Sequence, residues 1–364
     1  MYLHERDKWT NFTWDAAVVA PLLGDARFDQ GNLLGRVAGL GFSVGDRLQL
    51  DAVSQEVVAS SRIEGQELDP SKVRSSVARQ LGLGPCDDSL DTGAVDGAVA
   101  VMLDATVNFA APLTLERLAG WHAALFPAGY SGLRRIAVGQ LRTGPMQVVS
   151  GAIGHEKMHY DAPAANAVPA LMEEFLAWFN ENSSDNLLKA AIAHLWFLTI
   201  HPYDDGNGRM ARALTEMLLA RSDGSARRFY SMASFIMAHR EDYYREIESA
   251  QKGTRDITSW LVWFLQAFRC AIEASQEAVS AAEWRDAWWR RAEGVAMNQR
   301  QRYMLQRLMG DFQGKLTSGK WAKMCKVSSD TALRDISDLV AKGLLEKAPG
   351  SGRSTSYHVV NLSK

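Results

Sequence analysis

The stretch HPYDDGNGRMAR at residues 201–212 constrains the fold of this chain more than any other feature. The apolar segment before it, LLKAAIAHLWFLTI, has the pattern of a helix and runs directly into His201. Pro202 disfavours helical geometry at His201, while Gly206 and Gly208 permit close backbone approach and unusual dihedral angles. The following RMARALTEMLLA favours a second helix. The sequence therefore predicts a loop that ends at the N-terminus of that helix.

These residue types suit a site that binds an anion and moves a proton. Free amide groups and the helix dipole favour phosphate at a helix N-terminus. Arg209 and Arg212 are neighbours on the helix surface, where an anionic ligand would relieve their repulsion. Asp205 offers a hard oxygen ligand to Mg²⁺, and His201 can accept a proton from a hydroxyl group. The alternative is an ordinary turn before a solvated helix, and the flanking His-Pro and arginines argue against it.

The same stretch resembles the signature of the Fic family, which is His-Pro-Phe, any residue, Asp or Glu, Gly-Asn-Gly-Arg, any two residues, Arg. Tyr203 stands at the usual Phe position, an aromatic exchange compatible with core packing. The resemblance implies a helical fold and an adenylyltransferase that moves AMP from ATP to a Tyr, Thr or Ser hydroxyl, releasing pyrophosphate. No GxxxxGK[ST] sequence is present, which argues against the P-loop route to ATP.

The resemblance also implies a role for each residue of the site. His201 is the base, and Asp205 holds Mg²⁺ on the phosphates. The phosphate-binding residues are Gly206, Asn207, Gly208, Arg209 and Arg212, with Asn207 at the α-phosphate and Arg212 at the γ-phosphate. Downstream, HREDYYREIESAQ resembles the segment that covers the adenine. Tyr243 is expected to contact the base and Tyr244 to lie in the core, or the two roles are reversed.

A second motif, SSRIEG at residues 60–65, resembles the inhibitory motif of Fic proteins. Ser60 and Glu64 are four positions apart on a predicted helix that ends at Gly65. In the family, the glutamate pairs with the second arginine of the active-site motif, here Arg212, so that a carboxylate competes with phosphate for one guanidinium. Because both motifs belong to one chain, the sequence predicts autoinhibition in cis by Glu64.

A third motif, HEKMH at residues 155–159, satisfies the HExxH pattern of zinc proteases. In such a site His155 and His159 would bind Zn²⁺, and Glu156 would be the general base. The pattern requires a helix, yet glycines precede it and Pro163 follows it closely. We therefore treat the match as a coincidence and a zinc protease as a remote alternative.

Helical patterns predominate, so the predicted class is mainly α: a Fic-type helical core with a small β-hairpin flap, plus a C-terminal winged-helix (α+β) domain. Thr114 is a predicted N-cap. The hairpin is predicted in RRIAVGQLRTGPMQVVSG, around its Gly-Pro, and resembles the flap that aligns a target polypeptide by strand addition. The predicted parts are a helical segment over 1–95 with the inhibitory helix at about 46–65, the catalytic core over 96–275, a linker helix over 276–302 and the winged helix over 303–364.

The C-terminal segment has three short helical patterns followed by two strands around a Gly/Ser tip, which is the order of a winged helix. From residue 311 onward it has nine Lys/Arg and five Asp/Glu, a modest excess that suits a DNA backbone. Asp335 and Asp338 lie on the would-be recognition helix, which slightly favours protein docking or dimerisation. A DNA-binding regulator, with a Fic domain of other activity such as AMP removal, is the alternative function.

Composition sets the remaining limits. The chain has 364 residues, enough for two or three domains, and its 47% hydrophobic and 23% charged residues are typical of soluble globular proteins. A net charge of −2 gives no overall attraction to nucleic acid or membranes. Three distant cysteines fit a reducing compartment, and with no leader or membrane span we expect a cytoplasmic protein. Self-modification is expected where a neighbouring copy's hydroxyls reach the flap, and homodimers by analogy with the family.

Overall fold

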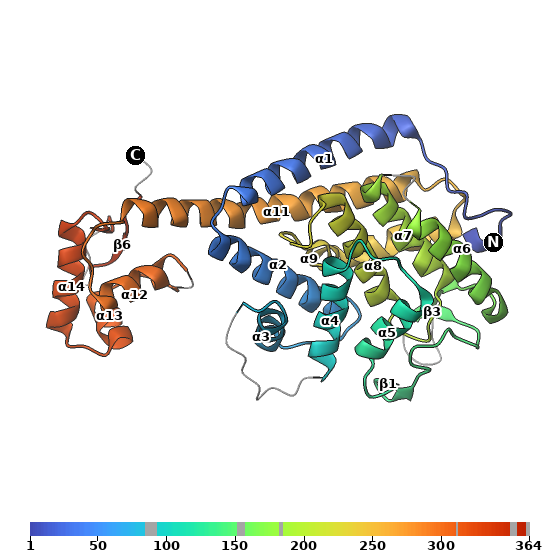
Figure 1. Ribbon diagram of the computed structural model, residues 1–364, viewed down its shortest axis with the longest axis horizontal. Coiled ribbons are helices and arrows are strands. Elements are labelled where there is room, and N and C mark those ends of the chain that lie inside the picture. Colours follow the sequence, from blue (N-terminus) through green and yellow to red (C-terminus); the bar gives the residue numbers. More distant parts are fainter. Residues whose placement is uncertain (84–92, 151–156, 182–184, 311, 350–354, 362–364) are drawn as a thin grey trace. The chain divides into compact units, whose positions relative to one another are not determined.

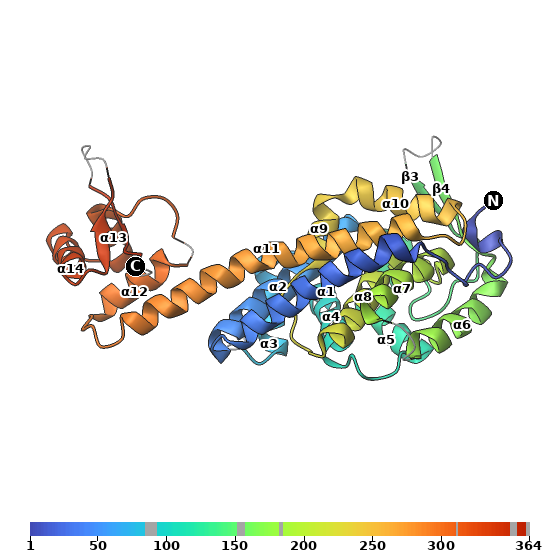
Figure 2. The same cartoon turned by 90° about the horizontal axis from the view of Figure 1, so that it is seen from above.

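The computed structural model (Figure 1 and Figure 2) describes residues 1–83, 93–150, 157–181, 185–310, 312–349 and 355–361. The chain divides into two compact units, Met1–Val279 and Ser280–Lys364. Most described residues are helical, and the described strands form two-stranded sheets, which confirms the mainly α class. The three domain boundaries drawn from the sequence stay predictions.

The first unit contains, in chain order, η1 (Leu3–Glu5), α1 (Ala16–Ala38), α2 (Phe42–Ile63), α3 (Pro70–Gln80), α4 (Gly93–Val107), α5 (Leu115–Leu125), β1 (Tyr130–Ser131), β2 (Arg134–Arg135), β3 (Gln147–Ser150), β4 (Lys157–Asp161), η2 (Ala165–Ala167), α6 (Val168–Asn180), α7 (Asn186–Ile200), α8 (Asn207–Asp223), α9 (Met232–Ala238) and α10 (Arg240–Lys252). The helix α11 (Thr258–Arg291) begins in the first unit and ends in the second. The second unit continues with α12 (Gln299–Leu308), α13 (Ser318–Cys325), α14 (Ser329–Ala341), β5 (Leu345–Lys347) and β6 (Tyr357–Val359).

The two helices that flank the HPYDDGNG loop, α7 and α8, pack along each other at the centre of the first unit (Figure 1). Every residue of α7 from Lys189 to Ile200 is buried, as expected of a helix that is apolar all round. Asp185 caps this helix by accepting a hydrogen bond from Leu187 N at 2.8 Å. Buried helices therefore hold the loop at both of its ends.

The capping residues expected from the sequence lie at the start of α5 and at the end of α2. The predicted N-cap of α5 is confirmed, because the Thr114 hydroxyl accepts from Arg117 N at 3.1 Å. The predicted inhibitory helix is α2, which begins earlier than expected at Phe42. It ends at Ile63, so that Glu64 is its C-cap and Gly65 follows with a φ of +76°, a backbone conformation that favours glycine.

The predicted hairpin around the Gly-Pro at residues 144–145 is wrong in its partners. β1 pairs with β2, and β3 pairs with β4, all antiparallel, so the segments on either side of the Gly-Pro do not pair with each other. β3 instead pairs with a strand that follows residues 151–156, which lie outside the described residues. The β3–β4 hairpin stands beside α10 (Figure 2).

A buried arginine explains why residues 136–146 form no strand. The side chain of Arg142 is enclosed, with the residue 2% exposed. Its guanidinium donates to four main-chain carbonyl groups, those of Pro163 at 2.6 Å, His201 at 2.7 Å, Gly144 at 3.0 Å and Ile200 at 3.3 Å. Carbonyl groups at the end of a helix have no partner within the helix, so Arg142 satisfies the end of α7. The alternation of apolar and polar residues that predicted strands here does not reveal that the Arg142 guanidinium is buried.

In the second unit, α12, α13 and α14 precede the antiparallel pair β5 and β6, and their apolar sides enclose a core around Trp321. This order is the one predicted for a winged helix, an assignment that stays a prediction. Asp335 does lie on α14, but it points inward: it is 6% exposed and its carboxylate is 2.8 Å from Arg300 Nε. Of the two acidic residues expected on this helix, Asp335 therefore faces the interior, while the side chain of Asp338 is 46% exposed.

We predict that Arg142→Ala lowers the free energy of unfolding by about 3 kcal/mol, because buried carbonyl groups lose a charged donor. Urea denaturation measures this change. The exposed Arg135 is the matched control, and Arg135→Ala should stay within about 0.5 kcal/mol of the wild type. Equal stability of the two variants would contradict this role of Arg142.

Candidate anion and proton-transfer site

His201 lies where α7 ends, in a left-handed conformation with φ 51° and ψ 61°. Its Nδ1 is 3.3 Å from the carbonyl oxygen of Leu198. A carbonyl oxygen only accepts, so Nδ1 carries the hydrogen and Nε2 is left as the acceptor of a proton. Burial lowers the pKa of His201 to about 4, which keeps the ring neutral at pH 7. The geometry thus presents a neutral imidazole with one free basic nitrogen.

The loop after His201 presents amide groups at the start of α8. Gly206 has a φ of +80°, and a Cβ there would come within 2.7 Å of the Phe126 ring. The side chain of Asn207 closes the loop by accepting from Tyr203 N at 3.0 Å and donating to Tyr203 O at 2.8 Å. Since α8 begins at Asn207, the N–H groups of its first residues have no partner within the helix. Asn207 therefore shapes the loop with its side chain and offers its main-chain N–H to an anion.

Both predicted arginines are buried beside this helix start. Arg212 is 2% exposed; it donates from Nε to Ser60 Oγ at 2.8 Å and from Nη2 to Ser60 O at 2.8 Å. Arg209 donates from Nη1 to Gln66 Oε1 at 2.8 Å, and its guanidinium lies 4.6 Å from the centre of the Phe126 ring. Arg212 Nη1 and Arg209 Nε are buried donors without a partner. Such unpaired donors beside free amide groups fit an anionic ligand.

The carboxylate of Glu64 lies in the same space. Its Oε1 is 2.7 Å from Arg212 Nη2. A Cβ built on Gly208, in the first turn of α8, would lie 2.0 Å from Glu64 Oε1 and 3.3 Å from Arg212 Nη1. The structure therefore brings Ser60, Glu64, Gly208 and Arg212 together, and the carboxylate occupies the position in front of α8 where an anion would bind.

Asp205 lies on the opposite side of the loop. Its carboxylate accepts from the hydroxyl of Ser131 and from Gly206 N. The charges of Asp205 and Glu64 both act on His201, which places the three side chains in one electrostatic neighbourhood. Asp205 is thus a carboxylate at the mouth of the amide site, positioned by β1.

His122 on α5 is a site residue that the sequence analysis missed. Gly139 N donates to its Nδ1 at 2.9 Å, so the hydrogen is on Nε2, which lies 3.2 Å from the carbonyl oxygen of Asp205. The imidazole also stacks on Tyr203, with ring centres 4.4 Å apart and planes 16° apart. Burial lowers the pKa of His122, which favours this neutral form. A single histidine in an amphipathic helix gives no sequence signal of this role.

The two adjacent tyrosines of α10, Tyr243 and Tyr244, differ in how far they are buried. Tyr243 is 1% exposed, and its hydroxyl lies 2.8 Å from His194 Nε2. Because Thr215 accepts from the other ring nitrogen of His194, at 2.9 Å, Tyr243 is the donor of its own bond. Tyr244 is 40% exposed and donates to Ile63 O at 3.3 Å, at the end of α2. Tyr243 is thus the core residue of the pair and Tyr244 borders the end of α2, and which of the two contacts a base stays a prediction.

The HExxH motif is only partly described, because His155 and Glu156 lie outside the described residues. His159 belongs to strand β4 instead of a helix. Its Nδ1 is 2.7 Å from Glu248 Oε2 on α10, and its Nε2 is 2.6 Å from Ser150 Oγ on β3. A zinc-protease site needs His159 on a helix, but here His159 lies on a strand and joins that strand to α10.

Comparison with known proteins identifies two segments. Residues 112–219 match the family described as Fic/DOC family, and residues 2–83 match a domain of unknown function, DUF4172. The protein adenylyltransferase Fic of Culex quinquefasciatus is 26% identical over 212 residues, which are 57% of this chain and 39% of that protein. The protein adenylyltransferase fic-1 of Caenorhabditis elegans is 31% identical over 85 residues, 22% of this chain and 16% of that protein. The chain thus spans well under half the length of these curated relatives.

Solved structures agree with the fold. A Fic family protein from Desulfovibrio desulfuricans G20 matches with a TM-score of 0.57 at 21% identity, over 95% of this chain and 97% of that one. A Fic domain containing signaling protein from Bacteroides thetaiotaomicron matches with a TM-score of 0.52 at 17% identity, over 71% of this chain and 95% of that one. These matches confirm the expected Fic-type helical fold. Among the described residues, no helix is long and apolar enough to cross a membrane.

We predict that the imidazole of His201 titrates near pH 4, because burial disfavours its charged form. It is then neutral at pH 7 and gains a proton only as the pH falls through about 4. Histidine ring signals followed by NMR against pH measure this, with the His201→Ala variant assigning the signal. A midpoint near the ordinary 6.5 would contradict the burial argument.

Proposed function

We propose that this chain, whose residues 112–219 match the Fic/DOC family, transfers AMP from ATP to a hydroxyl side chain of a target protein and releases pyrophosphate. The observation that carries the proposal is the partnerless Nη1 of Arg212 beside the free amide groups of α8. These donors match a phosphate group, and they lie in the same neighbourhood as the neutral His201.

In the proposed reaction the target hydroxyl gives its proton to Nε2 of His201. Its oxygen forms a bond to the α-phosphorus, the bond from that phosphorus to the bridging oxygen breaks, and pyrophosphate leaves. The amide groups of Asn207 and Gly208 stabilise the negative charge of the α- and β-phosphates. Arg209 and Arg212 bind the remaining phosphate oxygens, with Arg212 at the γ-phosphate. The β3–β4 hairpin supports the target chain by strand addition.

Asp205 is the residue that we propose holds Mg²⁺. No group of three or more His, Cys, Asp or Glu side chains in the described part of the chain suits a metal ion. Mg²⁺ needs no such group, since one or two carboxylates, water and substrate phosphates complete its shell. Asp205 fits as that single carboxylate beside the amide site. When bound, the ion supplies positive charge to the phosphates.

Glu64 is proposed to restrain this activity in cis. Its carboxylate takes the Arg212 donor and the space in front of Gly208 that a γ-phosphate requires. Two anions cannot share that position, because their repulsion would add to the loss of the guanidinium bond. In this proposal ATP either binds without a partner at its γ-phosphate, with the α-phosphate misplaced, or displaces Glu64.

We predict that Glu64→Gly raises AMP transfer on the order of tenfold or more, since it frees one charge-assisted bond. Adding His201→Ala should lower transfer at least about a hundredfold, because the base is lost. Labelled protein formed from α-labelled ATP and Mg²⁺ measures both changes. Label that persists in the double variant, or a Glu64→Gly protein that binds ATP without producing label, would refute the proposal.

The same assay distinguishes the roles of the two tyrosines. Tyr244→Ala, made in the Glu64→Gly background, should raise the KM for ATP severalfold and leave the unfolding free energy within about 0.5 kcal/mol, because its ring is half exposed beside the site. Tyr243→Phe should instead cost about 1 kcal/mol of stability, since it loses the bond to His194. A KM effect confined to Tyr243→Phe would support the first assignment.

Removal of AMP, or transfer of another nucleotide, remains the alternative at this site, and product analysis with labelled nucleotides separates them. For residues 303–364, Asp335 points inward but the side chain of Asp338 is 46% exposed on α14, so one of the two acidic residues that oppose a DNA backbone is withdrawn from the surface. A salt-sensitive duplex-binding assay on the full chain tests that alternative function.

A further inference from the structure

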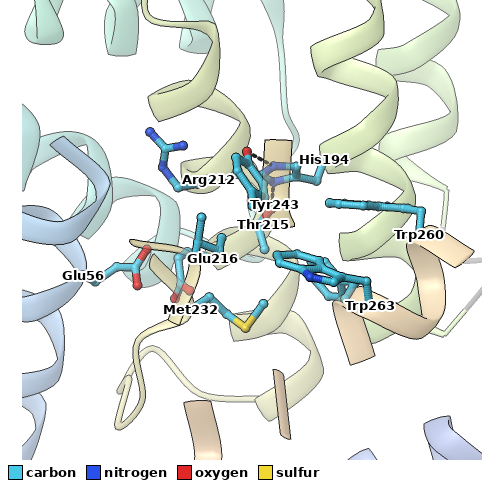
Figure 3. Close-up of a pocket in the computed structure, with 11 residues that line it drawn as sticks. Glu56, His194, Arg212, Thr215, Glu216, Met232, Tyr243, Trp260 and Trp263 are labelled. Atoms are coloured by element: carbon cyan, nitrogen blue, oxygen red, sulfur yellow. Dashed lines mark hydrogen bonds between the residues drawn. The ribbon is translucent and has the colours of Figure 1, made fainter. Parts of the chain in front are cut away.

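Buried carboxylates lie beneath Arg212, and the catalytic proposal does not use them. A small cavity of about 10 Å³ is lined among others by Glu56 from α2 and by Arg212 and Glu216 from α8. Figure 3 shows these side chains around it. Glu56 is 3% and Glu216 1% exposed. Carboxylates at this depth persist only where they are paired or hydrogen-bonded, so their partners show what holds them there.

Glu56 joins α2 to the start of α9. Its Oε2 accepts from Ser231 Oγ at 2.7 Å and from Ala233 N at 2.9 Å. On the other side of the cavity, Glu216 Oε2 accepts from Arg228 Nε at 2.8 Å. One side chain of α2 therefore reaches into the core and bonds a helix that is 175 or more positions away.

Unpaired polar atoms lie around the cavity. Glu56 Oε1, Glu216 Oε1 and Arg212 Nη1 are buried without a partner, and their side chains line the same cavity. Burial also raises the pKa of both carboxyl groups, so that the pair tends to retain a proton. Glu56 of α2 and Glu216 of α8 therefore line one cavity as two buried carboxyl groups.

Glu56 lies on the same face of α2 as the residues that contact Arg212. Glu56, Ser60 and Glu64 follow at intervals of four, and residues so spaced lie on one face of a helix. Ser60 and Glu64 are the two residues that contact Arg212. We propose that Glu56 is the positioning residue of the inhibitory helix: its buried carboxylate clamps α2 to the start of α9 and thereby sets Glu64 against Arg212. This inference rests on the proposed function, and it assigns a regulatory role to Glu56.

The test compares Glu56→Ala in the wild-type and Glu64→Gly backgrounds. In the wild-type background, AMP transfer should rise on the order of tenfold, because two buried donors lose their acceptor and α2 detaches. In the Glu64→Gly background it should not rise, since no inhibitory carboxylate is left to release. Glu56→Gln, whose amide oxygen can accept the same two bonds, should stay near the wild-type rate. Asp51→Ala, on the exposed side of α2, is the matched control and should change nothing.

A merely structural role predicts a different result, namely lower activity of Glu56→Ala in both backgrounds, and that result would overturn the proposal. Should Glu56→Ala fail to fold, Ser231→Ala removes one of the two bonds, and a smaller rise is expected.

Amide hydrogen exchange provides a readout that needs no activity. Exchange in residues 57–64 should increase in Glu56→Ala while exchange in α7 stays unchanged. If the Glu64→Gly protein transfers no AMP, the proposed function fails, and the exchange result still decides whether Glu56 holds α2. Unchanged exchange in residues 57–64 would refute the clamp.

Discussion

The guanidinium of Arg212 is the charge on which the site depends. It is 2% exposed at the first turns of α8, and a buried charge without a partner costs several kcal/mol. Some anion must therefore accompany it in every state of the protein. In this structure the hydroxyl and carbonyl of Ser60 and the carboxylate of Glu64 do so. In the proposed reaction a phosphate of the nucleotide takes the place of Glu64. Inhibition then follows from competition for one set of donors, and no long-range conformational signal is needed.

Hydrogen bonds with main-chain carbonyl groups hold His201, the proposed base, at the end of α7. His201 ends α7 in a left-handed conformation, and its imidazole bonds the carbonyl of Leu198. Arg142 satisfies the carbonyl groups of Ile200 and His201, so the helix end remains closed although it is buried. His122 holds the loop a few residues later through the carbonyl of Asp205. The geometry of the proposed site is thus maintained by side chains that bond to the backbone.

Two segments that are far apart in the chain meet at this place. The contact between Ser60 and Arg212 joins residues 152 positions apart, from α2 in the segment 2–83 and α8 in the segment 112–219. α2 is not held by its last turn alone, since Glu56 enters the core two turns earlier. A helix that is bonded at two levels detaches less readily than one that depends on a single exposed ion pair. The carboxylate of Glu64, 30% exposed, is the part of this contact nearest to solvent.

By itself the sequence determined the helices around residues 201–212, the N-cap at Thr114 and the glycines of the loop, because each of these depends on side chains within one or two helical turns. It also indicated the contact between the Ser60 and Arg212 motifs, because the two motifs resemble a known pair. Tertiary structure alone decided which of Tyr243 and Tyr244 enters the core, where the flap strands pair, and that His122, Arg142 and Asp335 turn inward. Local propensity is identical for two adjacent tyrosines in a helix. What separates them is burial against α2, α7 and α8, whose residues lie tens to hundreds of positions away and leave no trace in the neighbouring sequence.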